Sequence, residues 1–442
     1  MATQLQQARA GKITGQIKFA AEQEGIKPEQ LLSEVAAGKA VIPANKIHLK
    51  TNLKPAGIGR ILRTKVNANI GTSSVSSSIE LELKKLAVAL EVGSDAVMDL
   101  STGGDLDAIR QQLLQNCPVA FGTVPIYQIV ANRSVEDVDT KTILDVITKQ
   151  AQQGVDFFTI HAGVLKEYLP LVTSRVAGIV SRGGALIAKW MIHHNRQNPL
   201  YELFDDLCDI MAEYDVCFSL GDGLRPGAIA DATDEAQIAE LRTLGELVQR
   251  AREKGCQVMV EGPGHIPFDQ IQYNMEIQNK LCDGAPFYVL GPIVTDIAPG
   301  YDHITSAIGG TAAAFYGASF LCYVTPREHL GLPTIDDVRA GVVAAKIAGH
   351  AADIARGLPG ASSRDKQLSI ARNRLDWQNH LSQSLDPKTA AKMYNEACLQ
   401  AGVQTIDADY CTMCGKDWCS ARINRQIKEA MDDKKSQSSI GK

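Results

Sequence analysis

The sequence is poor in several features that mark whole classes of protein. Of 442 residues only 5% are aromatic, and 45 lysines and arginines nearly balance 50 aspartates and glutamates. A net charge of −5 gives no reason to expect a nucleic-acid partner. No uninterrupted apolar run reaches the roughly 18 residues of a membrane span. The first residues, MATQLQQARAGKITGQ, lack the apolar core of a signal peptide. We therefore expect a cytoplasmic protein with neither a membrane nor a nucleic acid as partner.

Cysteine is too sparse for a disulfide scaffold, with 10 in the whole chain. Buried small apolar side chains explain the scattered ones, which are Cys117, Cys208, Cys217, Cys256, Cys282, Cys322 and Cys398. Cys411, Cys414 and Cys419 instead crowd into CTMCGKDWC. Three thiolates at this spacing suit an iron–sulfur cluster or a zinc knuckle, with free thiols as the plain alternative. Structural zinc needs a fourth ligand, so the pattern favours a [4Fe–4S] cluster with one iron open to a small molecule such as S-adenosylmethionine.

The middle of the chain alternates between short apolar runs and segments with the apolar period of a helix. We count eight runs, at 96–102, 119–127, 157–163, 178–184, 217–223, 257–265, 287–292 and 320–326. Eight strand–helix units predict an α/β fold, a (β/α)8 TIM barrel, in preference to a doubly wound sheet.

Three regions follow from this pattern. Residues 1–95 mix helical and extended signals and are expected to form an N-terminal α/β layer that serves as a lid or dimerisation region. Residues 96–357 form the predicted catalytic barrel. Residues 358–442 are predicted as a C-terminal helical segment that carries the cysteine motif.

Polar residues gather at the predicted carboxyl ends of the strands, where barrel enzymes build their active sites. A core has no need of arginine, carboxylates and histidines at these positions. The candidates are Met98, Asp99, Tyr127, His161, Ser181, Arg182, Gly183, Asp222, Gly223, Arg225, Glu261, His265, Tyr288 and His329.

Two kinds of ligand site suggest themselves at this rim. The segments SRGG and DGLRPG each combine unhindered backbone amides with an arginine, so Arg182 and Arg225 could hold a phosphate. The glycines could equally serve only to make tight turns. His265 and His329 come from different strand ends and could ligate one divalent metal, zinc or iron. Hydrogen-bonded histidines without a metal are the alternative.

Long strings of this sequence resemble one family from about residue 10 to residue 430. They are NANIGTS, VMDLSTGGDLD, VPIYQ, TIHAGVL, GIVSRGG, SLGDGLRPG, VMVEGPGH, APFYVLGP, TDIAPGYDHI, LCYVTPREHLGLP and CTMCGKDWC. The chain is similar to phosphomethylpyrimidine synthase and its paralogue 5-hydroxybenzimidazole synthase.

This resemblance implies a radical S-adenosylmethionine lyase that rearranges 5-aminoimidazole ribotide. It implies a [4Fe–4S] cluster on Cys411, Cys414 and Cys419, and a divalent metal, zinc or iron, on His265 and His329. It also implies S-adenosylmethionine as cofactor, an external electron donor and a homodimer. The family's substrate-binding positions fall on Asn69, Met98, Tyr127, His161, Ser181, Arg182, Gly183, Asp222, Gly223, Leu224, Arg225, Glu261 and Tyr288.

The implied chemistry is a radical fragmentation in which the cofactor does the difficult step and the barrel positions the substrate. Arg182 and Arg225 are expected to hold the phosphate. Glu261 or Asp222 is expected to transfer a proton. The metal on the two histidines is expected to anchor the amino-acid end of S-adenosylmethionine.

The choice of product depends on departures from the usual thiamine pattern. VGSDAVMD, VANRSVEDVD, GGTAAAFYG and the GKDW between the last cysteines are such departures. They favour 5-hydroxybenzimidazole for cobamide biosynthesis, with the hydroxymethylpyrimidine phosphate of thiamine biosynthesis as the alternative. Two other classes stay open, a barrel lyase or hydrolase with a structural zinc and a non-catalytic iron–sulfur sensor.

Overall fold

Short runs of β-branched and aromatic residues form a closed barrel of eight parallel strands. The strands are β3 (Lys65–Ile70), β4 (Ala96–Asp99), β5 (Ala120–Thr123), β6 (Phe157–Ile160), β7 (Cys217–Leu220), β8 (Val258–Gly262), β9 (Phe287–Leu290) and β10 (Phe320–Cys322). β10 pairs with β3 and closes the ring. This computed structural model describes residues 2–73, 78–402, 410 and 412–440, with side chains as far as Asp432. The predicted α/β barrel is confirmed.

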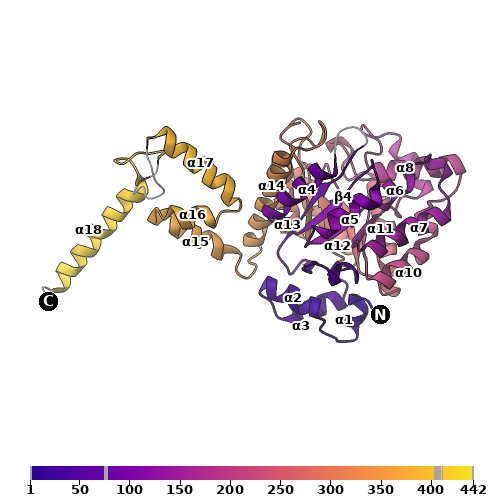
Figure 1. The fold of residues 1–442 in the computed structure, drawn as a ribbon, viewed down its shortest axis with the longest axis horizontal. Helices are drawn as coiled ribbons and strands as arrows, with labels where there is room; N and C mark the ends of the chain where they lie inside the picture. Colours follow the sequence, from indigo (N-terminus) through magenta and orange to yellow (C-terminus); the bar gives the residue numbers. More distant parts are fainter. Residues whose placement is uncertain (1, 74–77, 403–409, 411, 441–442) are drawn as a thin grey trace. The chain divides into compact units, whose positions relative to one another are not determined.

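Helices cover the outside of the barrel (Figure 1). They are α4 (Ile79–Glu91), α5 (Leu106–Gln115), α6 (Pro125–Val130), α7 (Thr140–Gln153), α8 (Arg182–His194), α9 (Pro199–Glu202), α10 (Phe204–Tyr214), α11 (Glu235–Glu253), α12 (Ile271–Leu281), α13 (Asp302–Tyr316) and α14 (Ile335–Ala355). Single 3₁₀ turns are η1 (His48–Lys50), η2 (Val135–Asp137), η4 (Ile229–Asp231) and η5 (Phe268–Gln270), and η3 (Lys166–Val172) is longer. Side chains cap the N-termini of several of these helices. At the start of α11, for example, the Asp234 side chain accepts a hydrogen bond from the Gln237 amide.

One predicted strand is wrong. Residues 178–181 are irregular and residues 182–184 already belong to α8, which Ser181 caps, and Val180 is 41% exposed. The missing strand is β3, which lies within the region 1–95. Its Asn67 and Asn69 alternate with apolar residues, and in a parallel strand buried on both faces such polar positions look unfavourable. Asn69 lines the pocket described below, and Asn67 donates to the hydroxyl of Tyr288, which also lines it.

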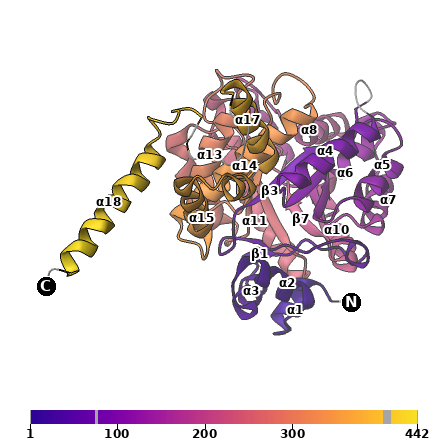
Figure 2. The same cartoon turned by 60° about the vertical axis from the view of Figure 1, so that its left-hand side comes forward.

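The first 64 residues cover the amino ends of the barrel strands. They contain α1 (Gln4–Arg9), α2 (Gly15–Glu24), α3 (Pro28–Ala36) and the pair β1 (Ala40–Val41) and β2 (Ile58–Gly59). Figure 2 shows the three helices together at one end of the barrel. His48 Nδ1 lies 2.7 Å from Asp156 Oδ2, and the Asn45 amide donates to the same carboxylate. Because Asp156 directly precedes β6, this layer closes the end opposite the predicted site.

Residues 360–442 make a second compact unit. It contains α15 (Ala361–Arg374), α16 (Trp377–Ser382), α17 (Pro387–Gln400) and α18 (Ser420–Ile440). The rings of Trp377 and Tyr394 stack with centroids 4.3 Å apart and join α16 to α17. Throughout the described residues, none of the helices combines the length and the apolar character that crossing a membrane requires.

Candidate active site at the carboxyl ends of the strands

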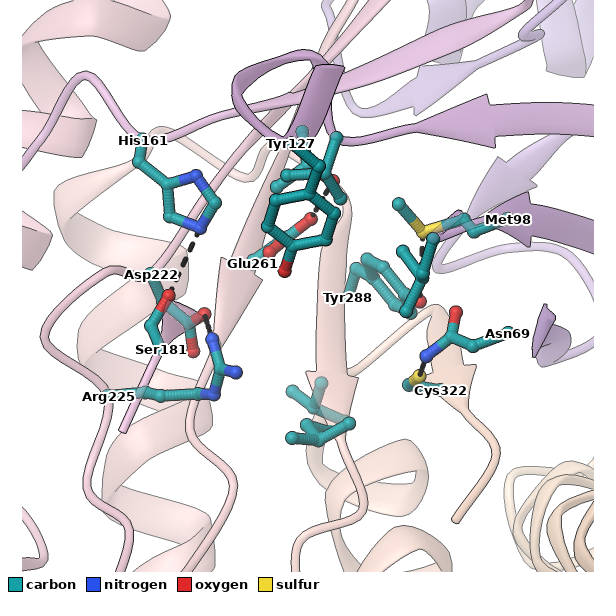
Figure 3. A pocket seen from close by; sticks show the side chains of 16 residues that line it. Asn69, Met98, Tyr127, His161, Ser181, Asp222, Arg225, Glu261, Tyr288 and Cys322 are labelled. Atoms are coloured by element: carbon teal, nitrogen blue, oxygen red, sulfur yellow. Dashed lines mark hydrogen bonds and ion pairs between the residues drawn. The ribbon is translucent and has the colours of Figure 1, made fainter. Parts of the chain in front are cut away.

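A pocket lies at the carboxyl ends of the barrel strands (Figure 3). Its mixture of apolar walls with a few polar groups is typical of small-molecule sites. Its lining comes from every part of the ring and consists of Asn69, Met98, Leu100, Val124, Tyr127, Thr159, His161, Ser181, Asp222, Arg225, Glu261, Gly262, Tyr288, Val289, Leu290 and Cys322. Most of the polar side chains predicted from scattered strand ends therefore meet in this pocket, whereas Asp99, Arg182, His265 and His329 are not part of its lining.

Asp222 and Arg225 lie in the loop after β7 and form an ion pair inside the pocket. Arg225 Nη1 donates to Asp222 Oδ1 over 3.0 Å. Burial raises the pKa of the Asp222 carboxyl to about 8, the nearby Glu261 adds to this shift, and Arg225 opposes it. A carboxyl that titrates close to neutral pH can hold or release a proton during a reaction.

Glu261 on β8 is held by hydroxyl groups from the two preceding barrel strands. Thr159 Oγ1 and Ser219 Oγ each donate to Glu261 Oε1 over 2.7 Å. Burial raises the pKa of Glu261 against these hydrogen bonds and against the charge of Arg225. Two carboxyl groups and one guanidinium thus share a space from which water is largely excluded.

His161 follows β6 and faces the start of α8. Ser181 Oγ accepts the Gly184 amide and lies 3.2 Å from His161 Nε2. Burial lowers the pKa of His161 to about 3, and Arg225 contributes, so the ring is neutral at pH 7. Because Ser181 Oγ already accepts the Gly184 amide, we assign the serine as donor to Nε2 and place the ring proton on Nδ1. Nδ1 is buried and has no partner among the described residues.

A chain of weaker contacts lines the opposite wall of the pocket. Asn67 Nδ2 donates to the Tyr288 hydroxyl over 2.7 Å, and that hydroxyl lies 3.6 Å from Met98 Sδ. Asn69 Nδ2 lies 3.1 Å from Cys322 Sγ, as Figure 3 shows. Burial raises the pKa of Tyr288 well above its ordinary value, so its hydroxyl stays protonated. This wall presents neutral groups, whereas the other carries the charges.

Arg182 stands at the edge of the pocket. Its guanidinium lies 4.8 Å from the ring centroid of Tyr127. It lines a larger adjoining pocket, which shares Asn69 and Leu100 with the first. The two arginines therefore face neighbouring spaces.

Three further predicted positions, Gly183, Gly223 and Leu224, lie behind the residues that line the pocket. A Cβ on Gly183 would lie 2.2 Å from His161 Cε1, and one on Gly223 would lie 2.3 Å from Val164 Cγ2. Leu224 is fully buried, and its amide donates to Glu240. These three residues pack the pocket wall and are not among the residues that line the pocket.

The two predicted metal ligands lie close together. The rings of His265 and His329 have centroids 5.2 Å apart. His265 Nδ1 lies 2.7 Å from Asp296 Oδ1, and His329 Nδ1 lies 3.0 Å from Asp302 Oδ1. A carboxylate on Nδ1 fixes the ring and leaves Nε2 as the ligand nitrogen, which is the usual second shell of a metal site. Among the described residues, no group of three or more ligand-type side chains lies together.

The cysteine motif belongs to the second unit. Cys411 lies outside the described residues. Cys414 is exposed, and Cys419 is buried directly before α18. The Ile423 amide donates to the Cys419 carbonyl over 3.0 Å, which places Cys419 at the first turn of this helix. A helix N-terminus stabilises a thiolate, so this part of the donor set suits a thiolate-held cluster.

Several residues of the site were not predicted from the sequence. Thr159, Ser219 and Asn67 lie within strands, where a polar residue gives no strand-end signal. Cys322 was interpreted as a small apolar residue. Asp296 and Asp302 both lie in the segment TDIAPGYD, whose sequence alone does not connect them with the histidines.

The chain is similar to several known proteins. A family model described as "Radical SAM ThiC family" matches residues 3–426. A phosphomethylpyrimidine synthase of Natronomonas pharaonis is 55% identical over 98% of this chain and 90% of its own length. Enzymes of the same name from Halobacterium salinarum and Desulforamulus reducens are each 54% identical, over 98% and 96% of this chain and 90% and 98% of their own lengths. A solved dihydropteroate synthase from Coxiella burnetii is 13% identical with a TM-score of 0.38, covering 66% of this chain and 94% of its own.

The expected benzimidazole product is wrong. These relatives, so similar over almost the whole chain, are all named for a phosphomethylpyrimidine. Of the sequence departures that favoured a paralogue, GGTAAAFYG contributes no residue to the lining of the pocket. In GGTAAAFYG, a Cβ on Gly309 of α13 would lie 2.0 Å from the Pro292 carbonyl oxygen, so the segment serves helix packing.

The expected partner changes with the product. We expected 5-aminoimidazole ribotide as the precursor of a benzimidazole, and the relatives' names contradict that expectation because they give a phosphorylated methylpyrimidine. The assignment to cobamide biosynthesis is wrong for the same reason.

The family itself is beyond question on two independent grounds, a match over residues 3–426 and relatives more than half identical. The chain belongs to the Radical SAM ThiC family, whose enzymes work with an iron–sulfur cluster and S-adenosylmethionine.

Proposed function

We propose that this chain is a phosphomethylpyrimidine synthase that makes 4-amino-2-methyl-5-hydroxymethylpyrimidine phosphate for thiamine biosynthesis. The observation that carries the proposal is the pocket, in which two carboxyl groups, an arginine, a neutral histidine and two tyrosines meet at the strand ends. Relatives of that name, 54–55% identical, support it.

The phosphate of the ligand would lie at the start of α8. Amides of the first helical turn point outward there, and a helix N-terminus attracts an anion. Ser181, Arg182 and Gly183 form this turn, and the Nδ1 proton of His161 has no other acceptor among the described residues. Arg225 brings a second positive charge to the same pocket.

Asp222 and Glu261 would hold and move protons on the ligand. Both lie beside Arg225 in the pocket, and burial raises the pKa of both carboxyl groups. Leu100, Val124 and Leu290 supply apolar walls that exclude water from the reacting groups.

Cys411, Cys414 and Cys419 would hold the cluster, so the second unit would be the cluster-binding region. Reduced and with S-adenosylmethionine bound, a [4Fe–4S] cluster supplies the radical that begins the reaction. His265 and His329 would hold one divalent metal, zinc or iron, through Nε2. Their carboxylate partners, Asp296 and Asp302, fit this role.

Growth complementation tests the proposed function. In a bacterial strain that lacks its own pyrimidine-forming enzyme, the chain should restore growth without added hydroxymethylpyrimidine, and mass spectrometry should detect the pyrimidine phosphate in extracts. Arg225→Met should abolish growth, because it removes the phosphate partner and leaves Asp222 unpaired. Arg196→Met is the matched control, since the Arg196 side chain is 62% exposed. Growth only with added hydroxymethylpyrimidine, despite soluble protein with an intact cluster, would contradict the proposal.

A further inference from the structure

A small second cavity lies behind the pocket, on the side of α11 and α12. We call it the rear cavity. Asp222, Arg225, Glu261 and Gly262 line both spaces and separate them. The rest of its lining is Gln237, Glu240, Leu241, Leu244, Pro263, Asn274 and Phe287. Its free space is enough for about one water molecule.

Two carboxylate oxygens that line this cavity have no partner among the described residues. They are Asp222 Oδ2 and Glu240 Oε1. The other oxygen of each group is engaged, since Asp222 Oδ1 accepts from Arg225 and Glu240 Oε2 accepts the Leu224 amide over 2.7 Å. Leaving a buried polar atom unpaired costs roughly 1–3 kcal/mol, so a further polar group is expected between them.

Two ionised carboxylates would repel each other strongly across one water, so at least one of them carries a proton, and burial raises the pKa of both carboxyl groups. Glu240 is only 2% exposed. Burial raises its pKa well above the ordinary value, and the charge of Asp222 adds to this shift. The Leu224 and Gly223 amides and Arg225 oppose the shift. Glu261 on β8 is the other titratable group that lines the cavity, and it brings no positive charge.

We propose that Glu240 is a protonated positioning residue, which accepts the Leu224 amide at one oxygen and donates through a buried water to Oδ2 of Asp222. This arrangement fixes the loop after β7 from behind. It turns the other oxygen of Asp222 toward Arg225, as Figure 3 shows for that pair. The role of Asp222 in catalysis rests on the proposed function, whereas the protonation of Glu240 does not.

The first experiment measures the protonation of Glu240 without any ligand. In the folded protein Glu240 keeps its proton at pH values where the unfolded chain has released it. The unfolded state then binds fewer protons, so stability of the wild type falls as pH rises above about 4.5, near the ordinary glutamate pKa. A glutamine side chain does not titrate, so Glu240→Gln should gain stability relative to the wild type between pH 5 and pH 8.

Urea unfolding at several pH values gives this difference. Glu246→Gln is the control, because Glu246 lies on the same helix with a side chain 52% exposed. A difference between wild type and Glu240→Gln that does not change with pH would mean that Glu240 is ionised when folded, and would overturn the proposal.

The second experiment tests positioning through the binding of ribose 5-phosphate, measured by calorimetry. Glutamine can accept from Leu224 and donate to the water, whereas methionine can do neither. We expect Glu240→Gln to bind within about threefold of the wild type and Glu240→Met to bind at least about tenfold more weakly. Equal binding by Glu240→Met and wild type, or equal weakening in both variants, would overturn the proposal.

The two experiments separate the two proposals. If the wild type does not bind ribose 5-phosphate, the phosphate site of the proposed function is contradicted, and the unfolding measurements still decide the state of Glu240. If Glu240→Met does not fold, the pH dependence of Glu240→Gln and its ribose 5-phosphate binding remain decisive.

Discussion

His161 lies buried between Ser181 and Gly183, where water cannot solvate a charged ring. It is 3% exposed, and burial lowers its pKa to about 3. A neutral ring can donate from Nδ1 to a ligand while it accepts from Ser181, which a doubly protonated ring could not do.

This protonation state predicts an effect of acid on stability. Below about pH 6.5 the unfolded chain gains a proton at His161 that the folded protein does not bind, so the wild type loses stability as pH falls toward 3. His161→Gln removes this contribution, and the difference should change by up to ~1.4 kcal/mol per pH unit between pH 6 and pH 4. Urea titrations check this, with exposed His193→Gln as control. Parallel curves for wild type and His161→Gln would contradict the assignment.

The carboxylates behind the histidine pair give a second prediction for single residues. Asp296→Asn weakens the acceptor on His265 Nδ1 and should reduce affinity for Co²⁺, used as a spectroscopic probe, by about 10- to 100-fold. Asp205→Asn is the control, on an exposed aspartate of α10. Equal Co²⁺ affinity of Asp296→Asn and wild type would contradict a metal site at His265 and His329 in which Asp296 orients His265.

Residues at the ends of strands were the most predictable part of the site. Asp222, Glu261 and His161 could be predicted because a barrel brings its strand ends together, whatever lies between them in sequence. Thr159 and Ser219 could not be predicted in this way, because their role depends on which strands are neighbours. Glu240 could not be predicted from the sequence either, because it lies on a helix and contacts the site through the loop after β7.

At the scale of elements, the start of α8 combines a cap with a close approach of two segments. Ser181 caps the helix, and Gly183 leaves room for the ring of His161. Sequence reasoning interpreted these residues as the end of a strand, because Ile179 and Val180 are β-branched. The structure shows why that fails, since Val180 is 41% exposed and pairs with no strand.

The close approach at Gly183 predicts a cost for adding a single methyl group. Gly183→Ala would place Cβ 2.2 Å from His161 Cε1. Relief requires moving the ring or the helix, and such overpacking costs about 1–3 kcal/mol. We expect a lower urea midpoint and weaker binding of ribose 5-phosphate. Gly15→Ala, whose Cβ would meet nothing within 4 Å, is the control and should not destabilise. A Gly183→Ala variant as stable as the wild type would contradict the packing argument.

At the scale of the whole molecule, the chain consists of two units that divide near residue 359. The pocket residues belong to the first unit and the cysteine motif to the second. Composition could predict this division, because polar segments rich in glycine and serine interrupt the pattern near residue 360. It could not predict that β3 belongs to the barrel, since its asparagines hide the apolar alternation.

Removal of the second unit tests whether the first unit alone binds the ligand and whether the second unit holds the cluster. We expect residues 1–359 to fold and to bind ribose 5-phosphate as the full chain does, because the pocket is complete within them. We expect the shortened protein to show no brown colour or iron–sulfur absorbance after reconstitution, whereas the full chain does. Absorbance that persists without the cysteine motif would place the cluster elsewhere.

The buried contact between His48 and Asp156 has a consequence for how the first unit melts. It ties the N-terminal layer to the strand that carries His161, with both side chains at most 2% exposed. Opening this layer would leave a carboxylate buried without its partner, so the layer and the barrel should lose their structure in one cooperative transition. A fluorescent label on an exposed position of α3, such as Glu29, would then report the melting of the barrel from the end opposite the pocket.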